Sequence, residues 1–176
     1  VWNEFCDWYL ELSKPVLWDD ATATSEQLGA RRTLITVLEK SVRMLHPFMP
    51  FLTEELNREI FVNEGLLIAD QWPQPVDVHD GGAVAELRFL IQLITEIRHI
   101  RAEMNVPLSA KPVLDVRGMS KLHERSIFNQ KAALLRLARL ADVSNVDGFA
   151  KGSARGSVDG VEIGLPLSEI LDLNAE

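Results

Sequence analysis

The first fifteen residues constrain the fold of this 176-residue chain more than any other stretch. Five of their apolar side chains recur at steps of three and four residues, which predicts one side of a helix: Trp2, Phe5, Cys6, Tyr9 and Leu12. Pro15 predicts the end of that helix, because proline cannot donate the N–H that a helix interior needs. So large an aromatic stripe is expected to be buried, with the rest of the chain packed on it.

Composition fits an ordinary globular chain, with 47% hydrophobic and 25% charged residues. The single cysteine, Cys6, excludes an internal disulfide and a multi-cysteine zinc site, and its place on the stripe indicates a core residue. No apolar run reaches the roughly 18 residues of a membrane span, so we expect a cytoplasmic protein. A net charge of −8 argues against a general nucleic-acid binder, and any RNA contact must therefore be local.

Apolar residues at helical spacing dominate the first two thirds of the chain. They predict helices at residues 25–46, 51–61 and 83–105, and Thr24 with Gln27 predicts a capping box for the first of these. Pro47 and Pro50 break the helical pattern between the first two. The stretch 66–78 is expected to be an irregular strap that Trp72 packs onto the bundle.

The pattern then changes to short strands around one helix. Strands are expected at 113–116, 143–146, 152–158 and 161–167, with a helix at 121–140, and Asp159-Gly160 is a strong hairpin signal. The predicted fold class is mainly α. Residues 1–105 form a helical bundle, and residues 106–176 form a small α+β unit of three to four short strands plus one helix.

No catalytic or metal-binding constellation is found. The four histidines stand apart without a helical metal-pair spacing, and no glycine-rich phosphate loop precedes a helix. We therefore expect no catalytic residue, no metal and no cofactor within these residues.

Basic residues gather in three places that could track RNA phosphates. On the predicted helix 121–140, five polar side chains fall within an arc of about 80°: Lys121, Arg125, Asn129, Arg136 and Arg139. The pairs Arg98/Arg101 and Arg43/His46 mark the ends of two other predicted helices. Each group could equally be a solvated outer face. Phe48 and Phe51 could stack on bases or pack in the core.

Five segments, in this order, resemble the anticodon-binding region of bacterial valyl-tRNA synthetases. They are F-C-D-W-Y-L-E-L-S-K-P (Phe5–Pro15), L-H-P-F-M-P-F-L-T-E-E-L (Leu45–Leu56), Trp72-Pro73, I-R-H-I-R-A-E-M-N-V-P (Ile97–Pro107) and V-E-I-G-L-P-L-S-E-I-L-D-L (Val161–Leu173). The resemblance covers nearly the whole chain.

The resemblance implies a helical bundle that recognises the anticodon of tRNA(Val). Other domains of such an enzyme attach valine to the tRNA with ATP, so ATP is expected in the parent protein and not here. It also implies that further helices precede these residues and that a coiled-coil tail follows them. Without those helices, apolar surface should be uncovered and the chain should self-associate.

Two alternatives remain open at this point. The bundles of isoleucyl- and leucyl-tRNA synthetases share this architecture, although the segment Val161–Leu173 favours the valyl family. A helical protein–protein interaction module without an RNA role also fits the acidic composition.

Overall fold

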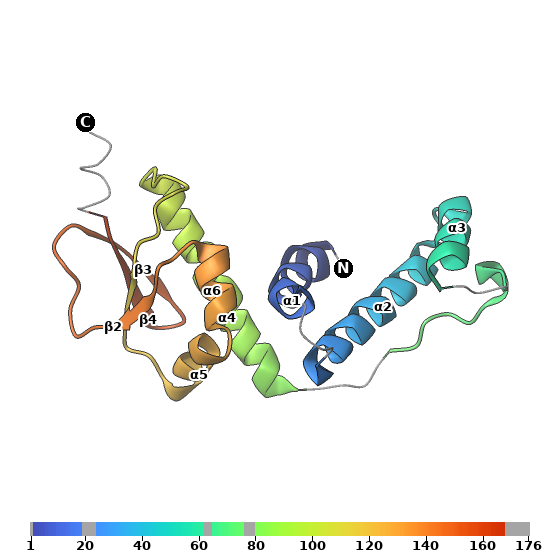
Figure 1. The fold of residues 1–176 in the computed structure, drawn as a ribbon, viewed down its shortest axis with the longest axis horizontal. Coiled ribbons are helices and arrows are strands. Elements are labelled where there is room, and N and C mark those ends of the chain that lie inside the picture. Colours follow the sequence, from blue (N-terminus) through green and yellow to red (C-terminus); the bar gives the residue numbers. More distant parts are fainter. Residues whose placement is uncertain (1, 19–23, 62–64, 76–79, 168–176) are drawn as a thin grey trace. The chain divides into compact units, whose positions relative to one another are not determined.

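The computed structural model describes residues 2–18, 24–61, 65–75 and 80–167, in two compact units at 1–78 and 79–176 (Figure 1). The first unit is helical, and the second combines helices with a four-stranded sheet. This confirms the predicted fold class. The helix Gly81–Glu103 (α4), which the sequence pattern grouped with the bundle, contacts elements of the second unit instead. None of the described helices is long and apolar enough to cross a membrane.

The first helix continues past Pro15, contrary to the prediction. Residues Trp2–Tyr9 (η1) wind as a π-helix and Leu10–Leu17 (α1) as an α-helix, with Pro15 inside it. Only one helical hydrogen bond is lost at this proline, and the Trp18 N–H still donates to the Lys14 carbonyl at 3.0 Å. The rings of Phe5 and Tyr9 stack with centroids 5.6 Å apart.

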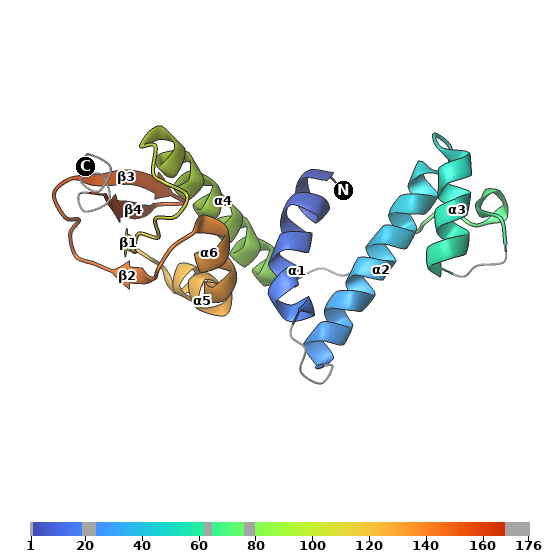
Figure 2. The same ribbon diagram turned by 45° about the horizontal axis from the view of Figure 1, so that its top comes forward.

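The next two helices follow the sequence signals closely. Helix α2 spans Ser25–Leu45, and the predicted capping box is present, since Thr24 and Gln27 exchange hydrogen bonds. Helix α3 spans Pro50–Phe61, with its proline in the first turn, where no helical N–H is needed (Figure 2).

Polar contacts hold the strap that follows α3. A short 3₁₀ turn, Leu67–Ala69 (η2), donates the N–H groups of Leu67 and Ile68 to the Glu54 carboxylate at 3.1 and 3.4 Å. The predicted packing of Trp72 is wrong, because its side chain is 59% exposed. The part of the predicted strap at 76–78 lies outside the described residues.

The first unit buries few apolar side chains. Among its described residues, only Val42 and Leu67 are buried hydrophobics, and the members of the N-terminal stripe Phe5, Cys6, Tyr9 and Leu12 are half-buried. The side chain of Trp2 lies outside the described part. Fourteen of the twenty exposed large hydrophobics in the described structure belong to this unit. The stripe alone therefore does not supply a closed core.

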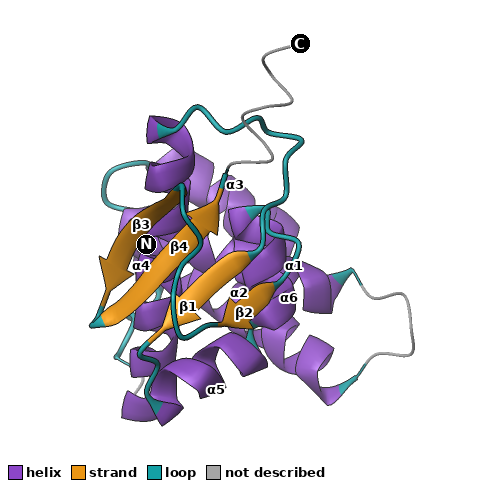
Figure 3. Cartoon of the chain, turned by 90° about the vertical axis from the view of Figure 1, so that its left-hand side faces the viewer, coloured by secondary structure: helices purple, strands orange, loops and turns teal. Residues whose placement is uncertain are grey.

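In the second unit, α4 packs against a mixed sheet of four strands (Figure 3). The strands are Leu114–Arg117 (β1), Val143–Asn145 (β2), Ser153–Val158 (β3) and Val161–Pro166 (β4), in the order β2-β1-β4-β3. β1 and β2 are parallel, and the other pairs are antiparallel. Gly156 on β3 lets α4 approach closely, because an added Cβ would lie 2.7 Å from the Glu96 carboxylate.

The crossover between β1 and β2 contains two short helices rather than the predicted long one. Lys121–Asn129 (α5) and Lys131–Ala138 (α6) are separated at Gln130, whose backbone leaves the helical region. Both pack on α4 and bury Ile127, Leu134 and Ala138. The basic arc computed for one continuous helix is therefore divided between two.

The predicted hairpin is confirmed between β3 and β4. Asp159 and Gly160 both have positive φ, 50° and 79°, as a tight two-residue turn requires. The turn is tied to the helices through His123, which stacks on Phe89 of α4 at 4.3 Å. The His123 Nε2 lies 3.4 Å from Asp159 Oδ2.

Candidate nucleic-acid interface

Three of the basic residues singled out from the sequence line one cleft in the second unit. Arg98 and Arg101 come from α4, and Arg139 follows α6, with Val106, Leu108 and Leu137 among the apolar lining. The cleft has a volume of about 340 Å³. We call it the arginine cleft. Arg98 and Arg139 are exposed at its surface, and Arg101 lies beneath with 7% of its surface exposed.

The guanidinium groups of this cleft are held by backbone carbonyls. Arg98 donates to the Leu137 carbonyl at 3.1 Å, and Arg139 donates to the Leu108 carbonyl at 2.9 Å. Arg101 donates to three carbonyls, those of Pro107, Ala110 and Arg139, at 3.0 to 3.3 Å. These acceptors fix the side chains without neutralising their charge.

No acidic residue lines the arginine cleft among the described residues. Burial, and then the neighbouring charge of Arg139, lower the pKa of Arg101. Arg101 and Arg139 bring like charges close together in a chain of net charge −8, and no described residue lining the cleft is acidic, so the cleft is a local site for an anion. Planar guanidinium forks match the oxygens of a phosphate.

Arg139 occupies a strained backbone position. It caps α6 in the left-handed region, at φ 54° and ψ 57°, where glycine is usual because it has no Cβ. A non-glycine residue there costs about 1 kcal/mol or more, and such strain gathers at functional sites. The spacing of basic residues along the sequence does not reveal this conformation, so only the structure distinguishes Arg139 from the other arginines in this way.

The remaining members of the predicted basic arc are not brought into the arginine cleft. Arg125 Nε and Asn129 Nδ2 both contact the Glu86 carboxylate, at 2.9 and 3.1 Å, so the charge of Arg125 is balanced. Lys121 and Arg136 are exposed on α5 and α6. They add positive charge to this unit but line no cleft described here.

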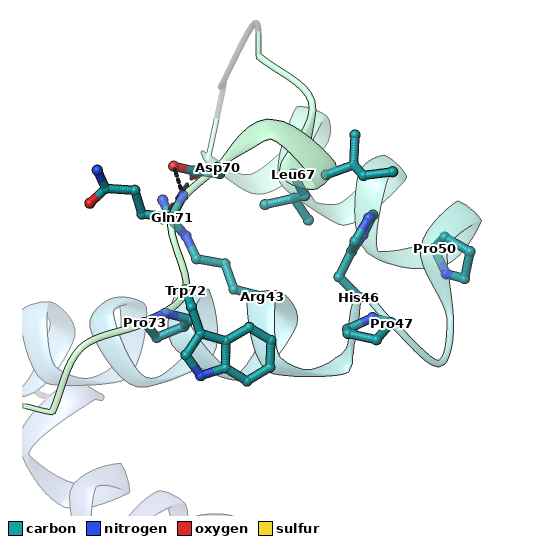
Figure 4. A pocket seen from close by; sticks show the side chains of 10 residues that line it. Arg43, His46, Pro47, Pro50, Leu67, Asp70, Gln71, Trp72 and Pro73 are labelled. Carbon is teal, nitrogen blue, oxygen red and sulfur yellow. Dashed lines mark hydrogen bonds and ion pairs between the residues drawn. The ribbon is translucent and has the colours of Figure 1, made fainter.

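The third predicted pair, Arg43 and His46, lines a cleft of about 470 Å³ in the first unit (Figure 4). Arg43 is neutralised, since its Nη2 lies 2.7 Å from Glu39 and its Nη1 2.9 Å from Asp70. His46 Nδ1 lies 2.8 Å from the Thr53 hydroxyl, which itself donates to the backbone carbonyls of Met49 and Pro50 at 2.8 and 3.1 Å. The wall is completed by a tryptophan, three prolines and the η2 turn: Trp72, Pro47, Pro50, Pro73, Leu67 and Ile68. We call it the Trp72 cleft.

Aromatic side chains are exposed in and beside this second cleft. Trp72 is 59% exposed, and Phe48 and Phe51, at the start of α3, are 80% and 92% exposed. Two roles were left open for these phenylalanines, stacking on bases and packing in the core. Neither side chain packs in the core of the described part of the first unit. The sequence pattern did not single out Trp72 as a binding residue, since tryptophan is usually buried.

Among the described residues, no three His, Cys, Asp or Glu side chains gather as a metal site. The two clefts are thus of different kinds. The arginine cleft is cationic and suits an anion, whereas the Trp72 cleft is lined mainly by apolar and ring-bearing side chains.

Comparison with known proteins gives one matching family model. Residues 1–117 match the anticodon-binding domain of tRNA ligase. The chain is also similar to the valine–tRNA ligases of Mesorhizobium japonicum, Caulobacter vibrioides and Agrobacterium fabrum, with 41%, 42% and 42% identity. Each alignment covers 100% of this chain and 19%, 20% and 19% of the relative, so the chain spans about a fifth of their length.

Proposed function

Since this chain belongs to the anticodon-binding domain family of tRNA ligases, we propose that it is the anticodon-recognition part of a valyl-tRNA synthetase. Its own residues bind and position tRNA(Val) and do no chemistry. The rest of that enzyme attaches valine to the tRNA with ATP, in the cytoplasm. The similarity to valine–tRNA ligases over the full chain favours this over an isoleucyl or leucyl enzyme.

The observation that carries the proposal is the arginine cleft. Arg98, Arg101 and Arg139 converge there, and none of the described residues that line the cleft carries a carboxylate, although the chain is acidic overall. Phosphate neutralisation by such side chains supplies most of the affinity of a protein for nucleic acid. A protein–protein interaction module would have no need of a guanidinium cluster in a cleft whose described lining holds no carboxylate, beside a strained arginine.

This proposal keeps the two parts of the chain that were predicted from the sequence and gives each a role. In it, residues 1–105, which include the first unit and helix α4 of the second, belong to the anticodon-binding part, and residues 106–176 form the junction to a coiled-coil tail. The contacts of α4 with the sheet join the two parts mechanically, and the arginine cleft draws on both.

The proposed function is tested by titrating the complete synthetase with tRNA(Val) and with the same tRNA carrying another anticodon. We expect tighter binding of tRNA(Val), with an affinity that falls as salt rises, by a logarithmic slope of several units. Equal and weak binding to both RNAs would contradict the proposal and favour the interaction module.

Self-association of the 176-residue chain is a second expected outcome. The large hydrophobic side chains Leu28, Ile35, Leu38 and Leu45 are exposed along α2, separated by steps of seven and three residues that place them on one helical face. Burying this face against a second copy removes apolar area from water. Sedimentation equilibrium should show dimers at high concentration, and fewer dimers for Ile35→Glu. A strict monomer at all concentrations would contradict this expectation.

A further inference from the structure

The Trp72 cleft has a chemistry suited to a ring rather than to a phosphate. Its floor and sides come from the indole of Trp72 and from Pro47, Pro50 and Pro73, and Figure 4 shows these groups around a hollow bordered by Arg43. A volume of about 470 Å³ can admit a planar heterocycle. Bases of single-stranded RNA stack on exposed aromatic side chains of this kind.

The charges of the cleft disfavour a phosphate. Arg43 lies between two carboxylates, Glu39 and Asp70, so the three groups together carry one net negative charge. A phosphate oxygen would meet that negative charge, whereas the amino group of a base can donate to a carboxylate. Asp70 lines the cleft and carries acceptor capacity beyond its bonds to Arg43 and to the Gln71 N–H.

One polar atom of the ion pair is not satisfied by the described protein. Arg43 Nε is buried and has no hydrogen-bond partner there, although both terminal nitrogens of the same group are paired. A buried donor without an acceptor costs free energy. Because this atom has almost no accessible surface, a ligand in the cleft does not contact it, and the Asp70 carboxylate remains a polar group that the cleft offers to a base.

We propose that the Trp72 cleft binds one unpaired nucleobase of the tRNA. The base stacks on the Trp72 indole and donates an amino N–H to Asp70. This inference rests on the proposed function and deepens it, since it assigns base recognition to a cleft separate from the phosphate-binding arginines. Cytosine, adenine and guanine carry the required amino group, and uracil does not.

A double-mutant cycle between Trp72 and single bases tests the assignment. The complete synthetase and its Trp72→Ala variant are titrated with tRNA(Val) in which each anticodon-loop base is replaced in turn by an abasic site. A stacked base contributes about 5- to 150-fold in affinity. Trp72→Ala should therefore weaken binding of unmodified tRNA by about tenfold, and at one loop position the abasic site should cause no further loss. Trp72→Phe should keep most of the affinity, because a ring remains.

Trp18→Ala is the matched control. Trp18 is 68% exposed in the same unit and does not line the cleft, so its removal should leave both affinity and coupling unchanged. Because Trp72 is itself largely exposed, its replacement should not unfold the unit, which circular dichroism will check.

Asp70→Asn tests the polar half of the proposal. At the coupled position, the wild-type protein should bind the amino-bearing base more tightly than uracil. Asp70→Asn should reduce this preference for an amino-bearing base over uracil at least several-fold, because the asparagine amide can donate as well as accept.

The outcomes separate this inference from the proposed function. If tRNA(Val) is preferred but Trp72→Ala shows no coupling to any loop position, the nucleobase assignment is wrong and the proposed function stands. A uniform loss across all abasic variants would equally overturn it, because it indicates a structural role. If the wild-type synthetase does not discriminate anticodons, both fail.

Discussion

Replacing Arg139 by glycine and Arg98 by glutamine is expected to weaken tRNA binding by at least about a hundredfold without unfolding the second unit. Each substitution removes a positive charge from the arginine cleft, and a hydrogen bond to a charged group contributes about 1.5–3 kcal/mol. The glycine also relieves the left-handed strain at φ 54°, which offsets the lost bond to the Leu108 carbonyl. Binding is measured by titrating the complete synthetase with tRNA(Val), and stability by urea unfolding of the 176-residue chain.

The salt dependence gives an independent measure of the same effect. Loss of two phosphate contacts should lower the logarithmic salt slope by about two. Arg125→Gln is the matched control, since Arg125 is equally basic in the sequence but is balanced by Glu86. If Arg125→Gln weakened binding as much as the double substitution, the arginine cleft would lose its special role.

Replacing Arg101 by methionine is expected to destabilise the second unit by about 3 kcal/mol or more. The side chain is 7% exposed and donates to three backbone carbonyls from two segments, at Pro107 and Ala110 and at Arg139. Leaving a buried acceptor unsatisfied costs about 1–3 kcal/mol. Urea unfolding followed by circular dichroism measures the change in the free energy of unfolding.

Two further variants separate geometry from charge. Arg101→Lys keeps the charge but has one ammonium in place of a planar fork, so it should recover little of the lost stability. Lys121→Met, at an exposed position of the same unit, should change stability by no more than about 0.5 kcal/mol. An Arg101→Met protein as stable as the wild type would show that water replaces the guanidinium at these carbonyls.

Local features of the fold were predictable because their causes lie within a few residues. The capping box of Thr24 and Gln27, the break at Pro47 and Pro50, and the turn at Asp159-Gly160 each depend on side chains or backbone freedom at that point. Apolar periodicity likewise placed α2, α3, α4 and the four strands within a few residues. Residue order also carried the family resemblance, which the comparisons bear out.

Predictions from local sequence signals were wrong where contacts with other parts of the fold outweigh the local preference. Pro15 stays inside α1, where only one helical hydrogen bond is lost and where α1 packs against α2. The helix expected at 121–140 divides at Gln130, and the two pieces pack separately on α4. Trp72 stays exposed because Glu54 and Arg43 hold the strap in its place.

The sequence by itself determined which residues are basic, where most of the helices and strands run, and which family the chain belongs to. Only the tertiary structure decided which of those basic residues act together. Arg98 and Arg101 are about forty residues from Arg139 in the sequence, and the packing of α6 on α4 brings them together. Glu86 neutralises Arg125, and Asp70 with Glu39 neutralises Arg43. Helical spacing fixes only the angle between side chains on one helix, whereas net charge at a site depends on partners that distant segments supply.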